Sequence, residues 1–122
     1  MSYFAVTCRR TGGWDWSRPM RRQVRFDEHA AFMDALVEHG FVVLGGPLGA
    51  GEDASTEVLL VVRARDESTV RARLAEDPWS AIGLLAVERV TPWTVLLDGC
   101  GRSGELRTAR DGEPVRATEA DA

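Results

Sequence analysis

A histidine and an aspartate in two distant segments are the residues of this sequence best suited to move protons near neutral pH. His29 lies early in the amphipathic run Phe26 to Met33, and Asp77 stands before Pro78, which fixes the backbone where a helix should stop. An imidazole titrates near pH ~6.5, and a neighbouring carboxylate fixes its tautomer and favours its charged form. The two residues therefore indicate proton-transfer chemistry or the binding of a small anion.

Each member of this pair also has a structural explanation. His29 borders the apolar stripe of its helix, and Asp77 could accept backbone hydrogen bonds at the turn before Pro78. His39, the other histidine, precedes Gly40 at an expected helix end, where a cationic ring complements the helix dipole. We therefore assign His39 no catalytic role, and leave both explanations open for the pair.

Three kinds of residue are candidates for binding a ligand beside the pair. Arg25 is one turn before His29, and belongs to a local arginine cluster that could hold a carboxylate or phenolate. The run Gly45 to Pro47 lacks the further glycines and the lysine of a phosphate loop, so Gly46 and Pro47 are expected to allow close backbone approach to a ligand. Trp79 is separated from the aspartate by one proline, and is expected in the pocket wall.

Composition excludes several classes of protein. The chain of 122 residues is the size of one domain, and 44% hydrophobic residues can fill a core. No apolar stretch reaches the ~20 residues of a membrane span, and a net charge of -4 argues against nucleic-acid binding. Cys8 and Cys100 have no partner at chelating spacing, so no metal site or disulfide is expected, and no cofactor is required. The cytoplasm is the expected location.

The hydrophobic periodicity predicts an α+β fold with the element order β-α-β-β-α-β, the ferredoxin-like arrangement. The antiparallel sheet should carry both helices on one face. The expected strands are 2–9, 41–44, 57–65 and 84–97, the last interrupted at Pro92, and the expected helices are 22–39 and 66–77.

A second copy of the chain is expected to cover the other face of the sheet. In residues 58–62 both faces are apolar, and two helices can cover only one of them. We therefore expect a homodimer with its sheets packed face to face. Residues 1–97 should form the domain, and residues 98–122, which have almost no apolar period, should form a flexible or surface-draped tail.

The sequence resembles the YCII-related (YciI-like) family of small bacterial proteins over about residues 2–97. The resemblance implies a ferredoxin-like fold that dimerises into an α/β barrel, and a site in which His29 and Asp77 form a dyad. Acid–base lyase or dehalogenase-like chemistry is the activity usually suggested for the family. The segments that carry the resemblance are Tyr3 to Val6, Arg25 to Met33, Gly40 to Leu48, Asp77 to Trp79 and Val87 to Trp93.

Two hypotheses of function follow. In the first, the protein is an enzyme in which His29 is a general acid or base on a compact anionic substrate, oriented by Asp77. In the second, it is a non-catalytic dimeric module that binds a metabolite or a partner protein. A hydrogen bond between His29 and Asp77 in a concave pocket favours the first hypothesis, and a large separation favours the second.

Overall fold

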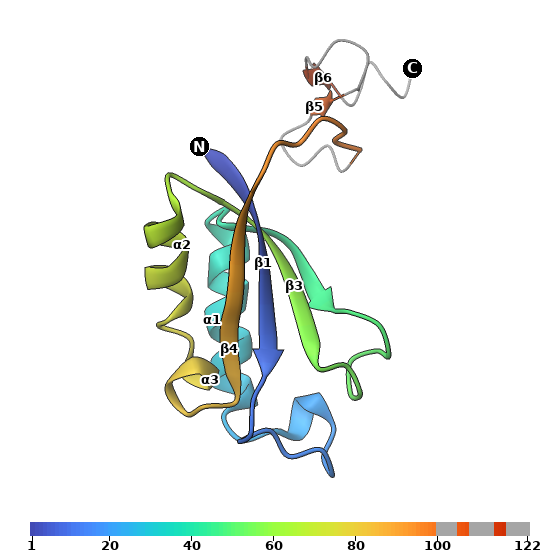
Figure 1. Cartoon of the computed structure of the whole chain (residues 1–122), viewed down its shortest axis with the longest axis vertical. Helices are drawn as coiled ribbons and strands as arrows, with labels where there is room; N and C mark the ends of the chain where they lie inside the picture. Colours follow the sequence, from blue (N-terminus) through green and yellow to red (C-terminus); the bar gives the residue numbers. More distant parts are fainter. Residues whose placement is uncertain (100–104, 108–113, 117–122) are drawn as a thin grey trace.

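The computed structural model describes residues 1–99, 105–107 and 114–116. Four strands form one antiparallel sheet in the order β2-β3-β1-β4, and β5 and β6 form a separate two-stranded ladder. The chain order of the domain is the predicted β-α-β-β-α-β (Figure 1). The strands are β1 (Ser2–Arg10), β2 (Val42–Pro47), β3 (Glu57–Ala64), β4 (Leu85–Trp93), β5 (Glu105–Arg107) and β6 (Pro114–Arg116); the helices are η1 (Met20–Arg22, a 3-10 turn), α1 (Phe26–Glu38), α2 (Glu67–Leu74) and α3 (Pro78–Ala81).

Local sequence signals account for the ends of the two longer helices. After α1, Gly40 adopts a positive φ of 75°, and the amide of Phe41 donates to the carbonyl of Leu36 at 3.0 Å, which is the bond of a Schellman motif. At the start of α2, the Asp66 carboxylate accepts from the amide of Thr69 at 2.8 Å and so caps the helix. Helix α1 begins at Phe26 instead of residue 22, because Arg25 leaves the helical conformation with a φ of 60°.

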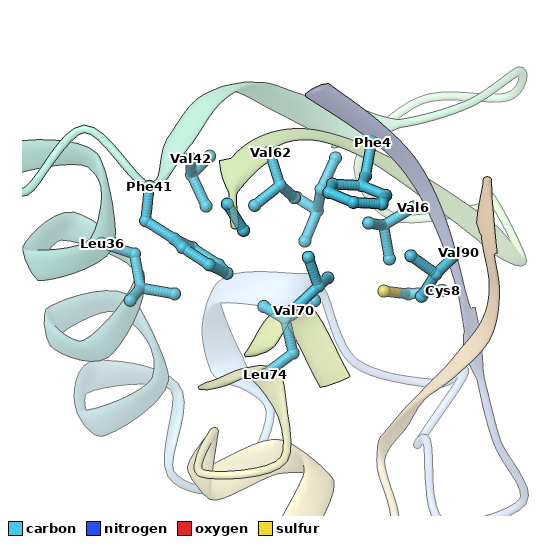
Figure 2. Close-up of a cluster of buried hydrophobic side chains, with 12 residues drawn as sticks. Phe4, Val6, Cys8, Leu36, Phe41, Val42, Val62, Val70, Leu74 and Val90 are labelled. Carbon is cyan, nitrogen blue, oxygen red and sulfur yellow. The ribbon is translucent and has the colours of Figure 1, made fainter. Parts of the chain in front are cut away.

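The main core lies between one face of the sheet and the helices α1 and α2. Alternate residues of the strands point into it, together with one residue of α1 and two of α2 (Figure 2). The members from the central strands and helices are Phe4, Val6, Cys8, Leu60, Val62, Ala64, Leu36, Val70 and Leu74.

The opposite face of the sheet is apolar as well. Tyr3 pairs with Trp93 across β1 and β4, and Leu44 pairs with Val61 across β2 and β3, so these side chains share that face. Leu44 and Trp93 are 60% and 47% exposed, respectively. The predicted two-sided hydrophobic strand is therefore present, while the chain in isolation does not show the expected dimeric barrel.

Strand β4 was predicted to break at Pro92, but Pro92 pairs with Phe4 inside the strand. A proline, which has no amide hydrogen to donate, is tolerated there because β4 is at the edge of the sheet.

Most of the predicted tail, 98–122, lies outside the described residues, so its character remains a prediction. Within the described residues, no helix has the length and hydrophobicity to span a bilayer.

Candidate active site

The side chains of His29 and Asp77 are in direct contact, although 48 residues separate them in the chain. Nδ1 of the imidazole lies 2.8 Å from Oδ1 and 2.9 Å from Oδ2 of the carboxylate. The Asp77 side chain is 4% exposed and the His29 side chain 14% exposed, so the contact is shielded from water. An ionised carboxylate can only accept hydrogen bonds, so we assign the proton to Nδ1 as the donor.

Asp77 owes its position to an element that the sequence analysis missed. Helix α2 ends at Leu74 instead of at Asp77, and Asp77 is the N-cap of the short helix α3. Its Oδ1 accepts from the amide of Trp79 at 3.0 Å, and Pro78 occupies the first helical position, where a missing amide hydrogen has no cost. The same carboxylate therefore caps α3 and contacts His29, so the structural role expected for Asp77 is compatible with a contact to the imidazole.

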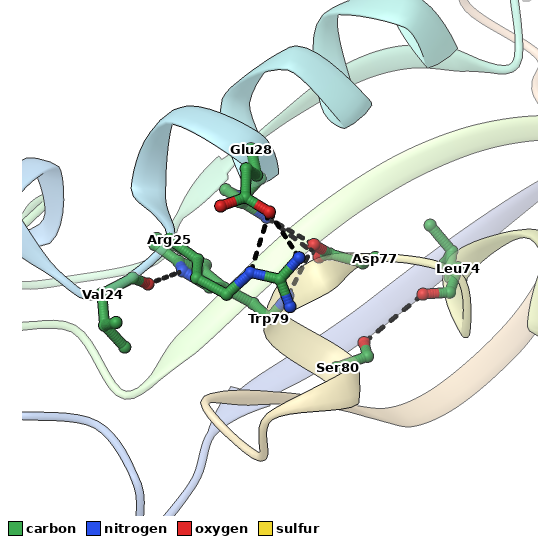
Figure 3. Close-up of polar contacts among 8 residues, drawn as sticks. Val24, Arg25, Glu28, Leu74, Asp77, Trp79 and Ser80 are labelled. Atoms are coloured by element: carbon green, nitrogen blue, oxygen red, sulfur yellow. Dashed lines mark hydrogen bonds and ion pairs between the residues drawn. The ribbon is translucent and has the colours of Figure 1, made fainter.

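The Trp79 side chain forms a wall against His29. Its ring stacks on the imidazole with centroids 3.7 Å apart and planes at 10°, and its Nε1 donates to the carbonyl of Val24 at 2.8 Å (Figure 3). On another side, Trp14 meets Trp79 edge to face at 5.1 Å. With Nδ1 bonded and one ring face covered, Nε2 of His29 is the ring nitrogen left for a ligand, since no described residue bonds to it.

A cavity of about 440 Å³ adjoins this contact. His29, Asp77 and Trp79 line it, as do Gly46 and Pro47 from the end of β2. The structure thus brings five of the six predicted site residues to one place. Most of the remaining wall is apolar and includes Met33, Val42, Val58, Leu60, Leu85 and Val87.

Arg25, the sixth predicted residue, does not line this cavity. Its Nε donates to the carboxylate of Glu28 at 2.9 Å near the start of α1 (Figure 3). The two side chains are exposed, and the bond from Arg25 lowers the pKa of Glu28. Arg25 was predicted to bind an anion of the substrate. It is engaged instead by Glu28, one turn further along the helix.

The arginine that does line the cavity is Arg10, which the sequence analysis did not single out. A signal for it was available, because Arg10 continues the alternation of Phe4, Val6 and Cys8 and so had to point toward the core. Met20 from η1 also reaches the cavity. No pattern in the sequence around Met20 indicated this, since the loop before α1 has no hydrophobic period.

Gln23 is a further buried polar residue that holds the loop before α1. Its Nε2 donates to the carbonyls of Asp15 and Arg18 at 2.7 and 3.1 Å, and its Oε1 accepts from the amide of Asp15 at 3.0 Å. These bonds fix the loop that carries Trp14 beside Trp79.

In the part of the chain that the structure describes, no group of three or more His, Cys, Asp or Glu side chains could hold a metal ion.

Comparisons with known proteins agree with this fold. Residues 3–94 match the model of the YCII-related domain. A solved structure of the 5-chloro-2-hydroxyhydroquinone dehydrochlorinase from Burkholderia phenoliruptrix, in complex with 2,5-dihydroxybenzoquinone, is similar with a TM-score of 0.50 and 29% sequence identity. The match covers 75% of this chain and 93% of that one. No curated protein matches the sequence.

Proposed function

The chain belongs to the YCII-related family, and from that membership we propose that it is a small-molecule enzyme with His29 and Asp77 as its acid–base dyad. The observation that carries the proposal is the 2.8 Å contact between the imidazole and a buried carboxylate at the wall of a cavity. The alternative, a non-catalytic binding module, does not need such a contact. The short separation therefore favours the enzyme.

The proposed chemistry takes place at Nε2 of His29. Asp77 holds the proton on Nδ1, which leaves the lone pair of Nε2 free to take a proton from the substrate. The carboxylate then stabilises the imidazolium that forms, and Trp79 keeps the ring in one plane. Oriented in this way, a histidine contributes a rate factor of about 10² to 10⁴.

The similar dehydrochlorinase suggests the class of substrate. That enzyme acts on a chlorinated hydroxyhydroquinone and binds a dihydroxybenzoquinone, and we propose a compact ring of this kind, anionic through its acidic hydroxyl groups, for this chain. The cavity of about 440 Å³ falls in the range of roughly 300 to 1,000 Å³ that is typical of small-molecule sites. In a loss of HCl from such a ring, one hydroxyl proton moves to the carbon that bears chlorine as the ring takes its keto form. Nε2 then accepts the proton of a second hydroxyl, and chloride leaves with the electrons of the C–Cl bond to give a quinone. Such a proton transfer uses side chains alone, so the proposal includes no cofactor.

We further propose that the working form is a homodimer built on the open face of the sheet. The exposed Leu44 and Trp93, with Tyr3 and Val61 beside them, form an apolar surface there. A second copy of the same face would remove these side chains from water and close the two sheets into the expected barrel.

The test of the proposal is chloride release from 5-chloro-2-hydroxyhydroquinone, measured without oxygen. Replacing His29→Asn should lower the rate about 10² to 10⁴-fold. The chain has one other histidine, so His39→Asn is a matched control, and it should retain the wild-type rate because His39 is exposed at the C-terminus of α1. Undiminished chloride release by His29→Asn would refute the dyad. A wild type that releases no chloride but binds 2,5-dihydroxybenzoquinone would favour the binding module.

A further inference from the structure

Arg10 is a buried cation in the wall of the same cavity as His29 and Asp77. It is the last residue of β1, and it is only 4% exposed. A buried charge is unfavourable unless it is paired, and arginines in protein interiors usually face a carboxylate. The partners of Arg10 therefore show whether its charge is already neutralised.

The hydrogen bonds of Arg10 go to neutral groups. Nη1 donates to the carbonyl of Ser55 at 2.8 Å, and Nη2 donates to the carbonyl of Glu52 at 2.6 Å. Nε is buried and has no hydrogen-bond partner among the residues that the structure describes. A guanidinium has more N–H groups than these two carbonyls occupy, so donors remain for another acceptor.

The two acidic side chains whose charges act on Arg10 bond to other groups. The Glu52 carboxylate pairs with Nε of Arg21 at 2.9 Å, and Oδ1 of Asp53 accepts from the amide of Met20 at 2.8 Å. Burial lowers the pKa of Arg10, and the charges of Asp53 and Glu52 oppose that effect only from a distance. Within the described part of the chain, Arg10 thus has no carboxylate in contact.

Aromatic rings fix the guanidinium and connect it to the dyad. The Cζ atom of Arg10 lies 4.1 Å from the centre of the Trp14 ring, and Trp14 packs edge to face on Trp79, which stacks on His29. Such stacking holds the planar group in one orientation without neutralising its charge. A ligand in the cavity therefore meets a preoriented cation as well as the imidazole.

We propose that Arg10 is the anchor for the negatively charged oxygen of the substrate, which makes the substrate an anionic carboxylate, phenolate or enolate on an apolar ring. This inference rests on the proposed function and assigns its specificity to one residue. The anion supplies the missing counter-charge, while the apolar walls contact the ring. Arg10, which lines the cavity, takes the role that was predicted for Arg25, which is engaged by Glu28 and does not line it.

The inference can be tested by calorimetric binding of two probes. One is 2,5-dihydroxybenzoquinone, whose acidic hydroxyls ionise, and the other is its neutral dimethoxy ether. The wild type should prefer the anion, and Arg10→Gln should weaken binding of the anion about 10- to 100-fold, the effect of a charge-assisted hydrogen bond, while binding of the ether stays unchanged.

A matched control separates anion binding from support of the loop 52–55. Asp53→Asn removes the charge that holds the amide of Met20, but leaves Arg10 in place, and it should keep the preference for the anion. Equal weakening of both probes in Arg10→Gln, or a wild type without preference, would overturn the inference. If Arg10→Gln does not fold, Arg10→Met, which also removes the charge but keeps an apolar stem, decides by the same criterion. Because binding is measured without turnover, failure of His29 as a catalyst leaves this result readable.

Discussion

The ring of His29 lies flat on the indole of Trp79, with centroids 3.7 Å apart and planes at 10°. Trp79 also donates its amide to Oδ1 of Asp77 at 3.0 Å. One residue therefore contacts both members of the proposed dyad, through its ring and through its backbone. Positioning of this kind matters in catalysis, because a displacement of about 1 Å can lower a rate about 10²-fold.

Two substitutions of Trp79 separate its ring from its hydrogen bond. Trp79→Phe keeps an aromatic face but loses the bond from Nε1 to Val24, so it should lose about 1 kcal/mol of stability and retain most of its activity. Trp79→Leu removes the face and should lower the rate of chloride release about 10²-fold in the folded fraction. Circular dichroism measures that fraction. Equal rates per folded molecule for the two variants would contradict the positioning role.

Neighbouring glycines at the end of β2 should respond differently to the same substitution. A Cβ at Gly45 would lie 2.5 Å from Cδ2 of Leu60 and 3.3 Å from the carbonyl oxygen of Leu59, whereas a Cβ at Gly46 meets nothing within 4 Å. We expect Gly45→Ala to lower the free energy of unfolding by about 1 to 3 kcal/mol, and Gly46→Ala to leave it unchanged. Urea denaturation compares them, and equal stability would mean that Leu60 yields without loss.

The buried thiol of Cys8 should make stability depend on alkaline pH. Burial, with the negative charges of Asp77 and Glu88, raises the pKa of Cys8 from 9.0 to about 12. The unfolded chain therefore releases the proton first, so this contribution is complete below pH 9.0 and is lost as pH rises toward about 12. When the pH is raised from neutral to one unit above 9.0, the ordinary pKa of the thiol, the free energy of unfolding should fall by about 1.4 kcal/mol.

The variant Cys8→Ala supplies the reference for this pH dependence. It is expected to be less stable at every pH because it leaves a cavity, but the difference from wild type should shrink as pH rises. Urea denaturation under reducing conditions at the two pH values gives both numbers. A constant difference would show that the thiol ionises equally in the folded and unfolded chain.

The proposed dimer predicts a light-scattering mass of twice the 13.4 kDa of one chain. Trp93→Glu places a charge on the open face of the sheet and should give a monomer. Trp16→Glu is a matched control, since Trp16 is 50% exposed, similar to Trp93, but lies in the loop before α1. A monomeric wild type at micromolar concentration would contradict the proposed interface.

The periodic parts of the sequence were sufficient to predict the order of the elements and the orientation of the strands. In β1 and β3 the alternation of hydrophobic side chains identifies the residues that face the helices. Gly40 marks the end of α1. Helix α3 was missed because its four residues are too few to show a helical period, and Asp77 before Pro78 was interpreted as an end.

Long-range contacts explain what the sequence left open in the site. The contact between His29 and Asp77 joins residues 48 positions apart, so the family resemblance, and not spacing, brought them together. Arg25 was chosen for its position on α1, but a local partner, Glu28, competes for its charge. Arg10 follows the core-facing alternation of Phe4, Val6 and Cys8, but its position at the cavity also depends on β1 lying between β3 and β4 in the sheet.

The protonation of the two ring nitrogens of His29 tests the dyad most directly. Long-range ¹H–¹⁵N correlation spectra, recorded about two pH units above the ordinary imidazole value of ~6.5, distinguish the two neutral tautomers. We expect Nδ1 of His29 to carry the proton and Nε2 to be bare, because Asp77 accepts the hydrogen bond from Nδ1. A proton on Nε2 with a bare Nδ1 would contradict the account, since Nε2 could then not act as the base.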